Sequence, residues 1–423
     1  MANGKPPVIL FGGDAINVLG AMRNLGRNKV QVYHVTEELS EATFSRYCKG
    51  SFIVPKIQQD MGKQRNLLKN FEKTGSTAVI FPCSDIFCLT LASLKEELGD
   101  SFHILAPRKE IAETLINKRK FYHSLEKQNI AHPITYFPES LADAQKIGQE
   151  ISYPVYLRPS ISQIFGQTFH TKGFVARSRE ELTKYYRLAT RYKIDVLIQE
   201  IVSSSAVELF GINSYFDEKS NPLGIFAYHR VREWPIGFGN GSLIESVPLS
   251  SVSQIRKTLV DYLQNMGFYG LVDAEFKRDP RDYKFRLLEI NPRSWWQNSL
   301  SQKCGINLIL MAYMDAIGHR TGSGGDYEAG VKWIHSFNDL RSVMKMFEDQ
   351  AITLPRWLSS LQKIRDWAFF SANDLFPWVL SPFFGFRSWS QMRMRQPPMV
   401  SCYEHAVGTK STRHIEHSSA NVY

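Results

Sequence analysis

The chain has 423 residues, of which 43% are hydrophobic and 13% aromatic, so it can form several folded units with sizeable cores. This composition excludes an intrinsically disordered protein. The formal net charge of +10 fits either binding to nucleic acid or anionic membrane, or a basic surface around sites for small anions. Because the sequence has no dense lysine and arginine block and no nucleic-acid-binding motif, we favour small anions and expect no nucleic-acid partner.

The five cysteines form no CxxC pair and no zinc-binding spacing, which indicates a reducing compartment. The N-terminal sequence lacks the features of a signal peptide. No window of about 18 apolar residues predicts a transmembrane helix. We therefore expect a cytoplasmic protein.

Strand-like and helix-like segments alternate over residues 1–106. PVILF predicts a buried strand, GGDAIN a turn, VLGAMRNLG a helix and KVQVYHV a second strand, and the pattern repeats up to HILAP. This order predicts a small Rossmann-like α/β domain with a parallel sheet. The turn at Gly12-Gly13-Asp14 fits either a plain tight turn or a phosphate or carboxylate site. Ser84 and Asp85 follow a predicted strand, where ligands often bind.

From residue 107 the sequence predicts helices, and then mixed strands and helices that become antiparallel in character after residue 206. The stretch SISQIFGQTFHTKG, which begins at Ser160, is predicted to be a polar loop. GLVDAEFKRD and KFRLLEIN, joined by the turn PRDY, predict a β-hairpin over residues 270–291.

Acidic side chains alternate along this hairpin. Alternation places Asp273 and Glu275 on one face of the first strand, and Glu289 and Asn291 on one face of the second. Carboxylates this close repel one another unless a cation lies among them, and Mg²⁺ with nucleotide phosphates is such a cation. A solvated polar face explains the alternation equally well. The sequence Asn-Pro-Arg, which begins two residues after Glu289, favours the metal site, since Arg293 can reach a phosphoryl oxygen or a carboxylate.

The segment GFYGLVDAEFKRDPRDYKFRLLEINPR resembles the metal-binding hairpin of the ATP-grasp family, and the resemblance covers roughly residues 107–320. The resemblance implies that Mg²⁺, replaceable by Mn²⁺, binds between the phosphates of ATP on Glu275, Glu289 and Asn291. It also implies that nucleotide contacts come from the "dK..f"-like segment, the strand YPVYLRP and the segment around QEIV. The residues implied to bind the nucleotide are Lys118, Arg158, Glu200, Val202 and Glu208.

The overall layout is similar to predicted carboxylate–amine ligases of the D-aspartate ligase group, in which GG-x-x-x-N also opens the chain. The similarity implies an α/β fold with an ATP-grasp module of α+β character. The units expected from it are a preceding domain (1–106), a small lobe (107–195), a large lobe with the hairpin (196–324), a helical aromatic-rich segment (325–404) and a flexible tail (405–423). It implies an enzyme that joins a small carboxylate or amino acid to an amine through an acyl phosphate.

Three arginines are candidates for the catalytic chemistry. Arg293 is expected to stabilise the acyl phosphate. Arg230 and Arg232 alternate on one face of HRVREWP and fit either binding of the acyl phosphate or substrate carboxylate, or surface salt bridges.

One position departs from the family pattern. Arg158 stands before Pro159 where the family has lysine, and a planar guanidinium presents its charge differently from an ammonium. We favour simple replacement, with Lys172 as a supplement and the loop Ser160–Gly166 lying over the phosphates. The alternatives are a nucleotide-binding regulatory protein without turnover, or a carboxylase-like enzyme that uses bicarbonate.

Aromatic residues cluster near the C-terminus. We favour packing of this cluster onto the catalytic body, and a membrane-surface patch or a partner groove is the alternative. A homo-oligomer is compatible with the sequence. The aromatic residues are Trp367, Phe369, Phe370, Phe376, Trp378, Phe383, Phe384 and Phe386.

Overall fold

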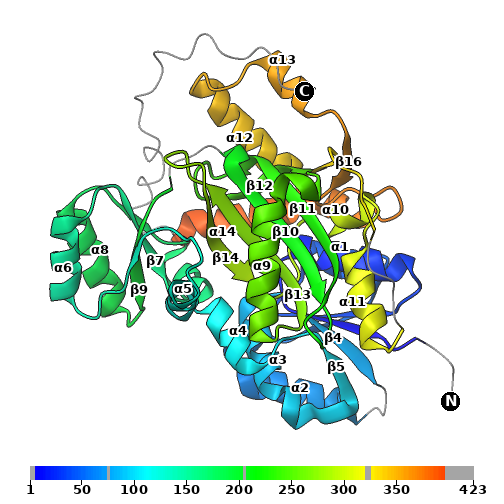
Figure 1. Cartoon of the computed structure of the whole chain (residues 1–423). Coiled ribbons are helices and arrows are strands. Elements are labelled where there is room, and N and C mark those ends of the chain that lie inside the picture. Colours follow the sequence, from blue (N-terminus) through cyan, green and yellow to red (C-terminus); the bar gives the residue numbers. More distant parts are fainter. Residues whose placement is uncertain (1–4, 74–76, 203–205, 320–324, 396–423) are drawn as a thin grey trace.

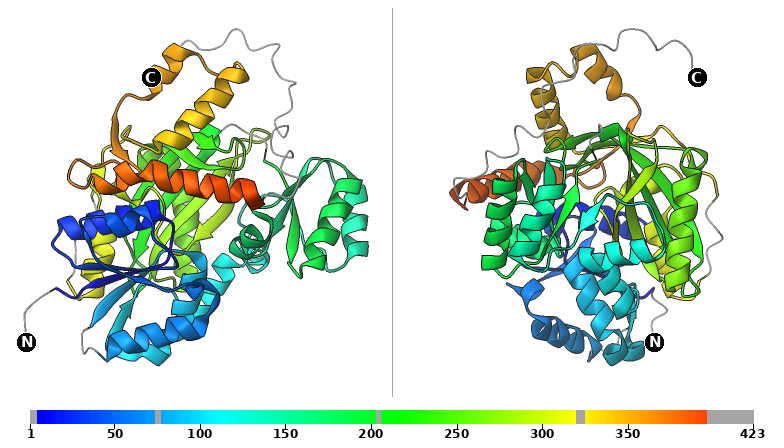
Figure 2. Two further views of the ribbon diagram at one scale, coloured as in Figure 1. Left: turned by 180° about the vertical axis from the view of Figure 1, so that it is seen from behind. Right: turned by 60° about the vertical axis from the view of Figure 1, so that its left-hand side comes forward.

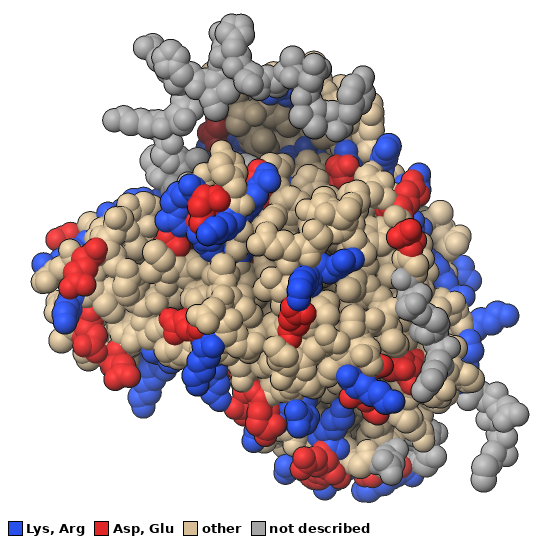
Figure 3. All heavy atoms as spheres, viewed as in Figure 1, with Lys and Arg blue, Asp and Glu red and all other residues tan. Residues whose placement is uncertain are grey.

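The computed structural model describes residues 5–73, 77–202, 206–319 and 325–395 (Figure 1). Three sheets of five, four and seven strands organise this part of the chain. The four-stranded sheet and its helices project to one side of the other two sheets (Figure 2). On the face shown in Figure 3, lysine and arginine side chains are interspersed with acidic ones, so the positive charge does not gather in one patch there.

The five-stranded sheet is parallel and has the order β3-β2-β1-β4-β5, which confirms the α/β opening predicted from the sequence. All four residues of the central strand β1 are buried, as expected for a parallel strand covered on both faces. Its elements are β1 (Val8–Phe11), α1 (Ala15–Arg27), β2 (Val32–Thr36), β3 (Cys48–Ile53), α2 (Met61–Glu72), β4 (Ala78–Pro82), α3 (Asp85–Leu98) and β5 (Phe102–Ile104).

The four-stranded sheet is antiparallel and has the order β6-β9-β7-β8, with α6 and α8 packed on its outer face (Figure 1). Helices α4 and α5 connect it to the parallel sheet. The elements are α4 (Lys109–Ile116), α5 (Lys118–Lys127), β6 (Thr135–Tyr136), α6 (Leu141–Glu150), β7 (Val155–Pro159), α7 (Ser162–Phe169), β8 (Phe174–Ala176), α8 (Arg179–Arg191) and β9 (Val196–Glu200).

Helix α7 occupies most of the stretch predicted to be a polar loop, so the predicted loop conformation is wrong, while its position over the phosphates stays a prediction. Phe165 is fully buried, and its ring lies 4.7 Å from that of Phe169 and 4.9 Å from that of Phe174 between centroids. Residues four apart share one face of a helix, so a helical turn brings both Phe165 and the partly buried Phe169 against the core of this sheet. The packing of these rings stabilises the helix more than the polar residues between them favour a loop.

The seven-stranded sheet contains the hairpin and has the order β14-β13-β10-β11-β12-β15-β16. Helix α9 lies along one of its faces (Figure 1), where Ile255, Leu259 and Leu263 enter the core. Helix α11 contacts β10, β11 and β13 and also packs against α1. The elements are β10 (Leu209–Phe216), β11 (Pro222–Trp234), β12 (Asn240–Ser246), α9 (Ser253–Met266), β13 (Gly270–Arg278), β14 (Phe285–Asn291), α10 (Asn298–Lys303) and α11 (Leu308–Ala316).

The sequence predicted a helical segment after residue 325, but the structure shows that this segment also contains strands. Two short strands, β15 (Lys332–Ile334) and β16 (Ile364–Trp367), extend the large sheet from β12. Strands of three or four residues are too short to show a hydrophobic period. The helices are α12 (Ser336–Glu348), α13 (Leu354–Ser360) and α14 (Phe376–Arg395). The tail predicted over 405–423 lies outside the described residues.

Helix α14 crosses the back of the molecule near α1 (Figure 2). Phe369 packs against the main core, but the side chains of Phe376, Trp378 and Phe383 are 69%, 48% and 82% exposed. Core packing therefore does not account for these three residues, and the Phe386 side chain lies outside the described part. No described helix is long and apolar enough to cross a bilayer.

Candidate active site

A polar pocket of about 340 Å³ lies where the parallel sheet meets the hairpin. Gly13 and Asp14 line it after β1, and Ser84 and Asp85 line it after β4. The carboxyl ends of these neighbouring parallel strands meet at one sheet edge, which is where open α/β sheets bind ligands. The opposite wall comes from the hairpin and from the loop that follows it.

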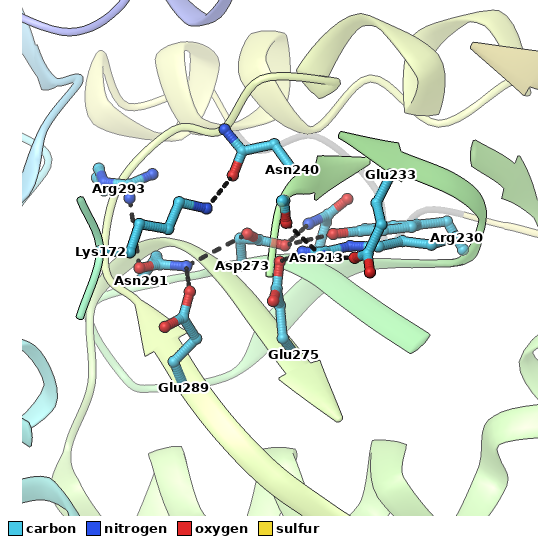
Figure 4. Close-up of polar contacts among 12 residues, drawn as sticks. Lys172, Asn213, Arg230, Glu233, Asn240, Asp273, Glu275, Glu289, Asn291 and Arg293 are labelled. Carbon is cyan, nitrogen blue, oxygen red and sulfur yellow. Dashed lines mark hydrogen bonds and ion pairs between the residues drawn. The ribbon is translucent and has the colours of Figure 1, made fainter. Parts of the chain in front are cut away.

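The hairpin brings its four polar residues together as the alternation predicted. Asp273 lies opposite Asn291, and Glu275 lies opposite Glu289, across β13 and β14. The Asn291 Nδ2 atom donates to Glu289 Oε1 over 3.3 Å and to Asp273 Oδ2 over 3.5 Å (Figure 4). Glu275, Glu289 and Asn291 all line the pocket, so their oxygens are available to one ligand.

Asp273 is held by the protein rather than left for a ligand. Its carboxylate accepts hydrogen bonds from Asn213 Nδ2 over 2.7 Å and from the Tyr228 hydroxyl over 3.2 Å. Burial, together with the nearby Glu275 charge, raises the pKa of Asp273 to about 7. This residue therefore positions Asn291 and is less suited to bind a cation directly.

Three cations surround Glu289. Its Oε2 atom lies 2.5 Å from Arg158 Nη2 and 3.5 Å from Lys118 Nζ. Lys172 reaches across from the small sheet and donates to Asn240 Oδ1 over 2.7 Å (Figure 4). Burial alone would raise the pKa of Glu289, but Lys118, Arg158 and Lys172 outweigh it and hold this pKa well below its usual value. Glu289 is therefore ionised at neutral pH.

The surplus of positive charge here suits phosphate. Lys118 is buried and donates its backbone N–H to the Ser160 carbonyl, which fixes the start of α5 beside β7. The buried Nε atom of Arg158 has no hydrogen-bond partner among the described residues. An unpartnered buried donor is costly, so this guanidinium has an unused donor for an anionic ligand.

Arg230 and Arg293 line the pocket on either side of the carboxylates. Arg230 Nη2 lies 2.5 Å from Glu275 Oε1, and Arg230 Nη1 lies 3.0 Å from Glu233 Oε2. Arg293 Nε lies 2.7 Å from Asp85 Oδ1, and its Nη2 donates to Asn291 Oδ1 over 3.3 Å. Arg293 thus connects the hairpin to the edge of the parallel sheet.

Arg232 lies outside the pocket. The sequence predicted that Arg230 and Arg232 share one face of a strand, but the two side chains do not lie in the same site. The β11–β12 register shifts between these residues. Arg232 makes a bidentate pair with Asp339 of α12, with N–O distances of 2.7 and 2.9 Å, and both side chains are 3% exposed. It also donates to Ser360 Oγ over 2.7 Å. The residue does not line the pocket, and we assign it a structural role.

Replacing Arg232 with methionine should destabilise the fold by about 3–5 kcal/mol, because the buried Asp339 carboxylate loses its counter-ion. The double variant Arg232→Met/Asp339→Leu should recover most of that loss. Urea unfolding followed by circular dichroism measures both free energies. A well-folded Arg232→Met protein with a kcat reduced more than tenfold would instead show that Arg232 acts in catalysis.

The residues expected at the base end of the nucleotide do not line this pocket. Glu200 accepts from the Ile134 N–H over 2.8 Å and pairs with Arg281 over 2.7 Å. Glu208 pairs with Arg278 over 2.5 Å, and Val202 is buried. Their nucleotide roles stay predictions.

A buried amide network that the sequence did not reveal ties α1 to the loop after the hairpin. Asn17 Nδ2 donates to the Cys83 carbonyl over 2.9 Å and to the Ser294 carbonyl over 3.0 Å. Asn298 Nδ2 donates to the Asn17 carbonyl over 2.8 Å. Trp296 Nε1 donates to Asp14 Oδ2 over 2.9 Å. The one signal in the sequence was the GG-x-x-x-N opening, which ends at Asn17.

The residues present fit a hard cation such as Mg²⁺, although among the described residues no three His, Cys, Asp or Glu side chains cluster as a preformed metal site. Glu275, Glu289 and Asn291 offer only oxygen ligands, which Mg²⁺ prefers. Mg²⁺ is usually bound by one or two carboxylates, with phosphates and water as its other ligands. This site matches that coordination, because it has two carboxylates for the cation and nearby lysine and arginine side chains for phosphate.

Solved structures with this arrangement of sheets are ATP-grasp enzymes, and the chain has the ATP-grasp fold. The biotin carboxylase domain of Hydrogenobacter thermophilus 2-oxoglutarate carboxylase, solved with magnesium ADP and bicarbonate, aligns with a TM-score of 0.60 and 14% identity over 78% of this chain and 74% of that chain. The L-amino acid ligase of Bacillus licheniformis aligns with a TM-score of 0.56 and 14% identity over 74% of this chain and 75% of that chain.

In sequence, the chain resembles D-aspartate ligase from Enterococcus faecium, with 23% identity over 325 residues, or 73% of this chain and 76% of that protein. No protein-family model matches the chain.

Proposed function

We propose that the protein is an ATP-dependent ligase that joins a carboxylate to an amine through an acyl phosphate. The opposed pair Glu275 and Glu289, with Lys118, Arg158 and Arg293 around it, carries the proposal because this set combines metal ligands with phosphate-binding cations. The similarity to D-aspartate ligase and to L-amino acid ligase supports an amino acid or another small carboxylate as substrate.

Glu275, Glu289 and Asn291 would hold Mg²⁺, or Mn²⁺ in its place, which supplies positive charge beside the phosphates of ATP. Lys118 and Arg158 would bind phosphate oxygens once Glu289 turns to the metal. Glu200, Val202 and Glu208 would contact the rest of the nucleotide. The protein contributes position and charge, since phosphoryl transfer requires little covalent chemistry from side chains.

In the first step, a substrate carboxylate oxygen bonds to the γ-phosphorus of ATP, and the bond to ADP breaks. In the second step, the amine nitrogen bonds to the acyl carbon, phosphate leaves, and the nitrogen loses a proton. Arg293 lies between Asp85 and Asn291, where its guanidinium can neutralise the oxyanion of the tetrahedral intermediate. Arg230, on the other side of Glu275, would bind the substrate carboxylate.

An ADP-release assay with a matrix of carboxylates and amines tests this proposal. Amino acids, small carboxylates and bicarbonate supply one axis, and amines supply the other, all with Mg²⁺ and ATP. We expect ADP release that requires a member of each axis. ADP release with bicarbonate in place of an organic acid would indicate a carboxylase-like reaction instead. We further expect the reaction in the cytoplasm, with small molecules as partners.

A second candidate is a nucleotide-binding protein without turnover. The short contact between Arg158 and Glu289 favours it, because an ion pair with Arg158 keeps Glu289 from binding the metal. That candidate predicts tight ATP binding and no ADP from any pair in the matrix. Restoring the family's lysine with Arg158→Lys should then create activity. A ligase should instead change its kcat only modestly in this variant.

A further inference from the structure

A second cavity, of about 510 Å³, lies beside the active site. Helix α1 forms one wall, and the end of α10 and the segment after β16 form the others. Trp296 lines both cavities and donates to Asp14 Oδ2 at the edge of the active site. The second cavity therefore begins where the active site ends, with one indole ring between them.

This cavity is elongated along α1. Ile16, Gly20, Arg23 and Arg27 line it, and their spacing of four, three and four residues places them on one face of the helix. With a rise of 1.5 Å per residue, Ile16 and Arg27 are about 16 Å apart along the axis. A ligand that fills the cavity thus has one end near the active site and the other near Arg27.

The lining of the cavity combines rings with unused polar groups. Trp333, Trp367 and Phe370 line it together with Trp296. Trp333 is 1% exposed, and its Nε1 atom has no hydrogen-bond partner among the described residues. The buried Oε1 atom of Gln302, another lining residue, is also unpartnered within the described part of the chain. Buried polar atoms normally have partners, so a donor and an acceptor here are available to a bound molecule.

The far end of the cavity is positively charged. Arg23 is neutralised by Asp374 over 2.8 Å, and Arg365 pairs with Glu328 over 2.5 Å. Arg27 donates to the Ser371 hydroxyl over 2.9 Å and forms no salt bridge with any carboxylate in the described part of the chain.

Lys303 has no carboxylate within salt-bridge distance in the described ranges, and the lining residue Asp366 accepts from Ser299 Oγ over 2.6 Å. Burial raises the pKa of Asp366 against the charges of Lys303, Arg23 and Arg27.

We propose that this cavity binds the amine substrate, and that this substrate is an extended amine with an anionic group at the end away from the reacting nitrogen. The inference rests on the proposed ligase function. The anion would bind Arg27 and Lys303, the body would lie on the indole rings, and the amine would pass Trp296 to reach the acyl carbon. A peptide extends at most about 3.3–3.6 Å per residue, so about five extended residues are needed to span about 16 Å.

Peptide acceptors test the charge requirement. The probes are the pentapeptide Gly-Ala-Phe-Gly-Gly with a free C-terminal carboxylate, the same peptide as its C-terminal amide, and glycinamide, which is too short to reach Arg27. Each is assayed for ADP release at saturating ATP and carboxylate. We expect the peptide acid to have a kcat/KM at least tenfold above that of the peptide amide.

The double variant Arg27→Glu/Lys303→Glu should remove or reverse this preference and leave kcat/KM for glycinamide unchanged. Lys257→Glu, at an exposed α9 position with a 75% exposed side chain, is the matched control and should keep the wild-type preference. Equal kcat/KM for acid and amide, or a preference that survives the double variant, would overturn the inference while leaving the ligase function intact.

Binding without turnover separates the two claims. Quenching of tryptophan fluorescence by each peptide, without ATP, reports occupancy of the ring-lined cavity. If no amine supports ADP release, the ligase function fails. The amine-site inference fails with it, even where the peptide acid still quenches more strongly than the amide. Equal quenching by acid and amide would count against the charged far end.

Discussion

Replacing Glu289 with glutamine should lower kcat by about 10³-fold while the chain stays folded. Glutamine keeps the shape of the side chain but removes the charge that pairs with Lys118 and Arg158 and that would hold the cation. Purified protein is assayed for ADP release over a range of Mg²⁺ concentrations, and circular dichroism verifies the fold. ATP binding in Mg²⁺-free buffer should not weaken, because both cations are retained.

Asp282→Asn is the matched control for this variant. Asp282 lies in the turn of the same hairpin and pairs with Arg286 over 2.7 Å, away from the pocket. This substitution also removes one carboxylate charge, and kcat should stay within about twofold, as expected for a surface pair. A Glu289→Gln enzyme with kcat within threefold of the wild type would show that Glu289 is not a metal ligand.

Replacing Arg293 with methionine should lower kcat by about 10²–10³-fold, in the range measured when one oxyanion donor is removed. The KM for ATP should change little, because in the proposed function Lys118 and Arg158 would supply the phosphate contacts. Arg293→Lys should retain part of the activity, since a lysine keeps the charge but loses the planar fork. Steady-state kinetics with each substrate varied in turn separates these effects.

The Arg293 substitution also leaves Asp85 without its partner, so a second variant is needed. Arg293 pairs with Asp85 over 2.7 Å, and Asp85→Asn removes the pair while keeping the guanidinium. We expect Asp85→Asn to keep a kcat within tenfold of the wild type and Arg293→Met/Asp85→Asn to be as slow as Arg293→Met. An equal loss in Asp85→Asn and Arg293→Met would mean that the ion pair, rather than the arginine, matters.

The hairpin was predictable because its information is local. Period-two alternation over β13 and β14, with a turn of suitable residues between them, determines which side chains face each other. The structure pairs Glu275 with Glu289 as the alternation requires. The parallel opening was also predictable, since buried strands and amphipathic helices alternate there with short connections.

Contacts that the local pattern does not encode were missed. Alternation placed Arg230 and Arg232 together, but a register shift in β11 and the distant Asp339 separate them. Helix α7 was taken for a polar loop because the polar residues in it obscured the packing of Phe165 and Phe169 against each other and against Phe174.

Long-range pairs had no signal of their own. Arg293 and Asp85 are 208 residues apart in sequence, and Asn17 and Ser294 are 277 apart. The pocket is assembled from such pairs, so its walls could not be derived from one sequence. The group of hairpin carboxylates could be derived, since these residues lie on a single hairpin.

The most direct test of the ligase proposal follows oxygen atoms. The carboxylate substrate found in the ADP-release matrix is labelled with ¹⁸O in both carboxyl oxygens and turned over with ATP and the amine, and the released phosphate is analysed by mass spectrometry. An acyl phosphate transfers one carboxylate oxygen to phosphorus, so we predict one ¹⁸O atom in each phosphate released. Unlabelled phosphate, formed at the same rate as ADP, would contradict the acyl-phosphate mechanism.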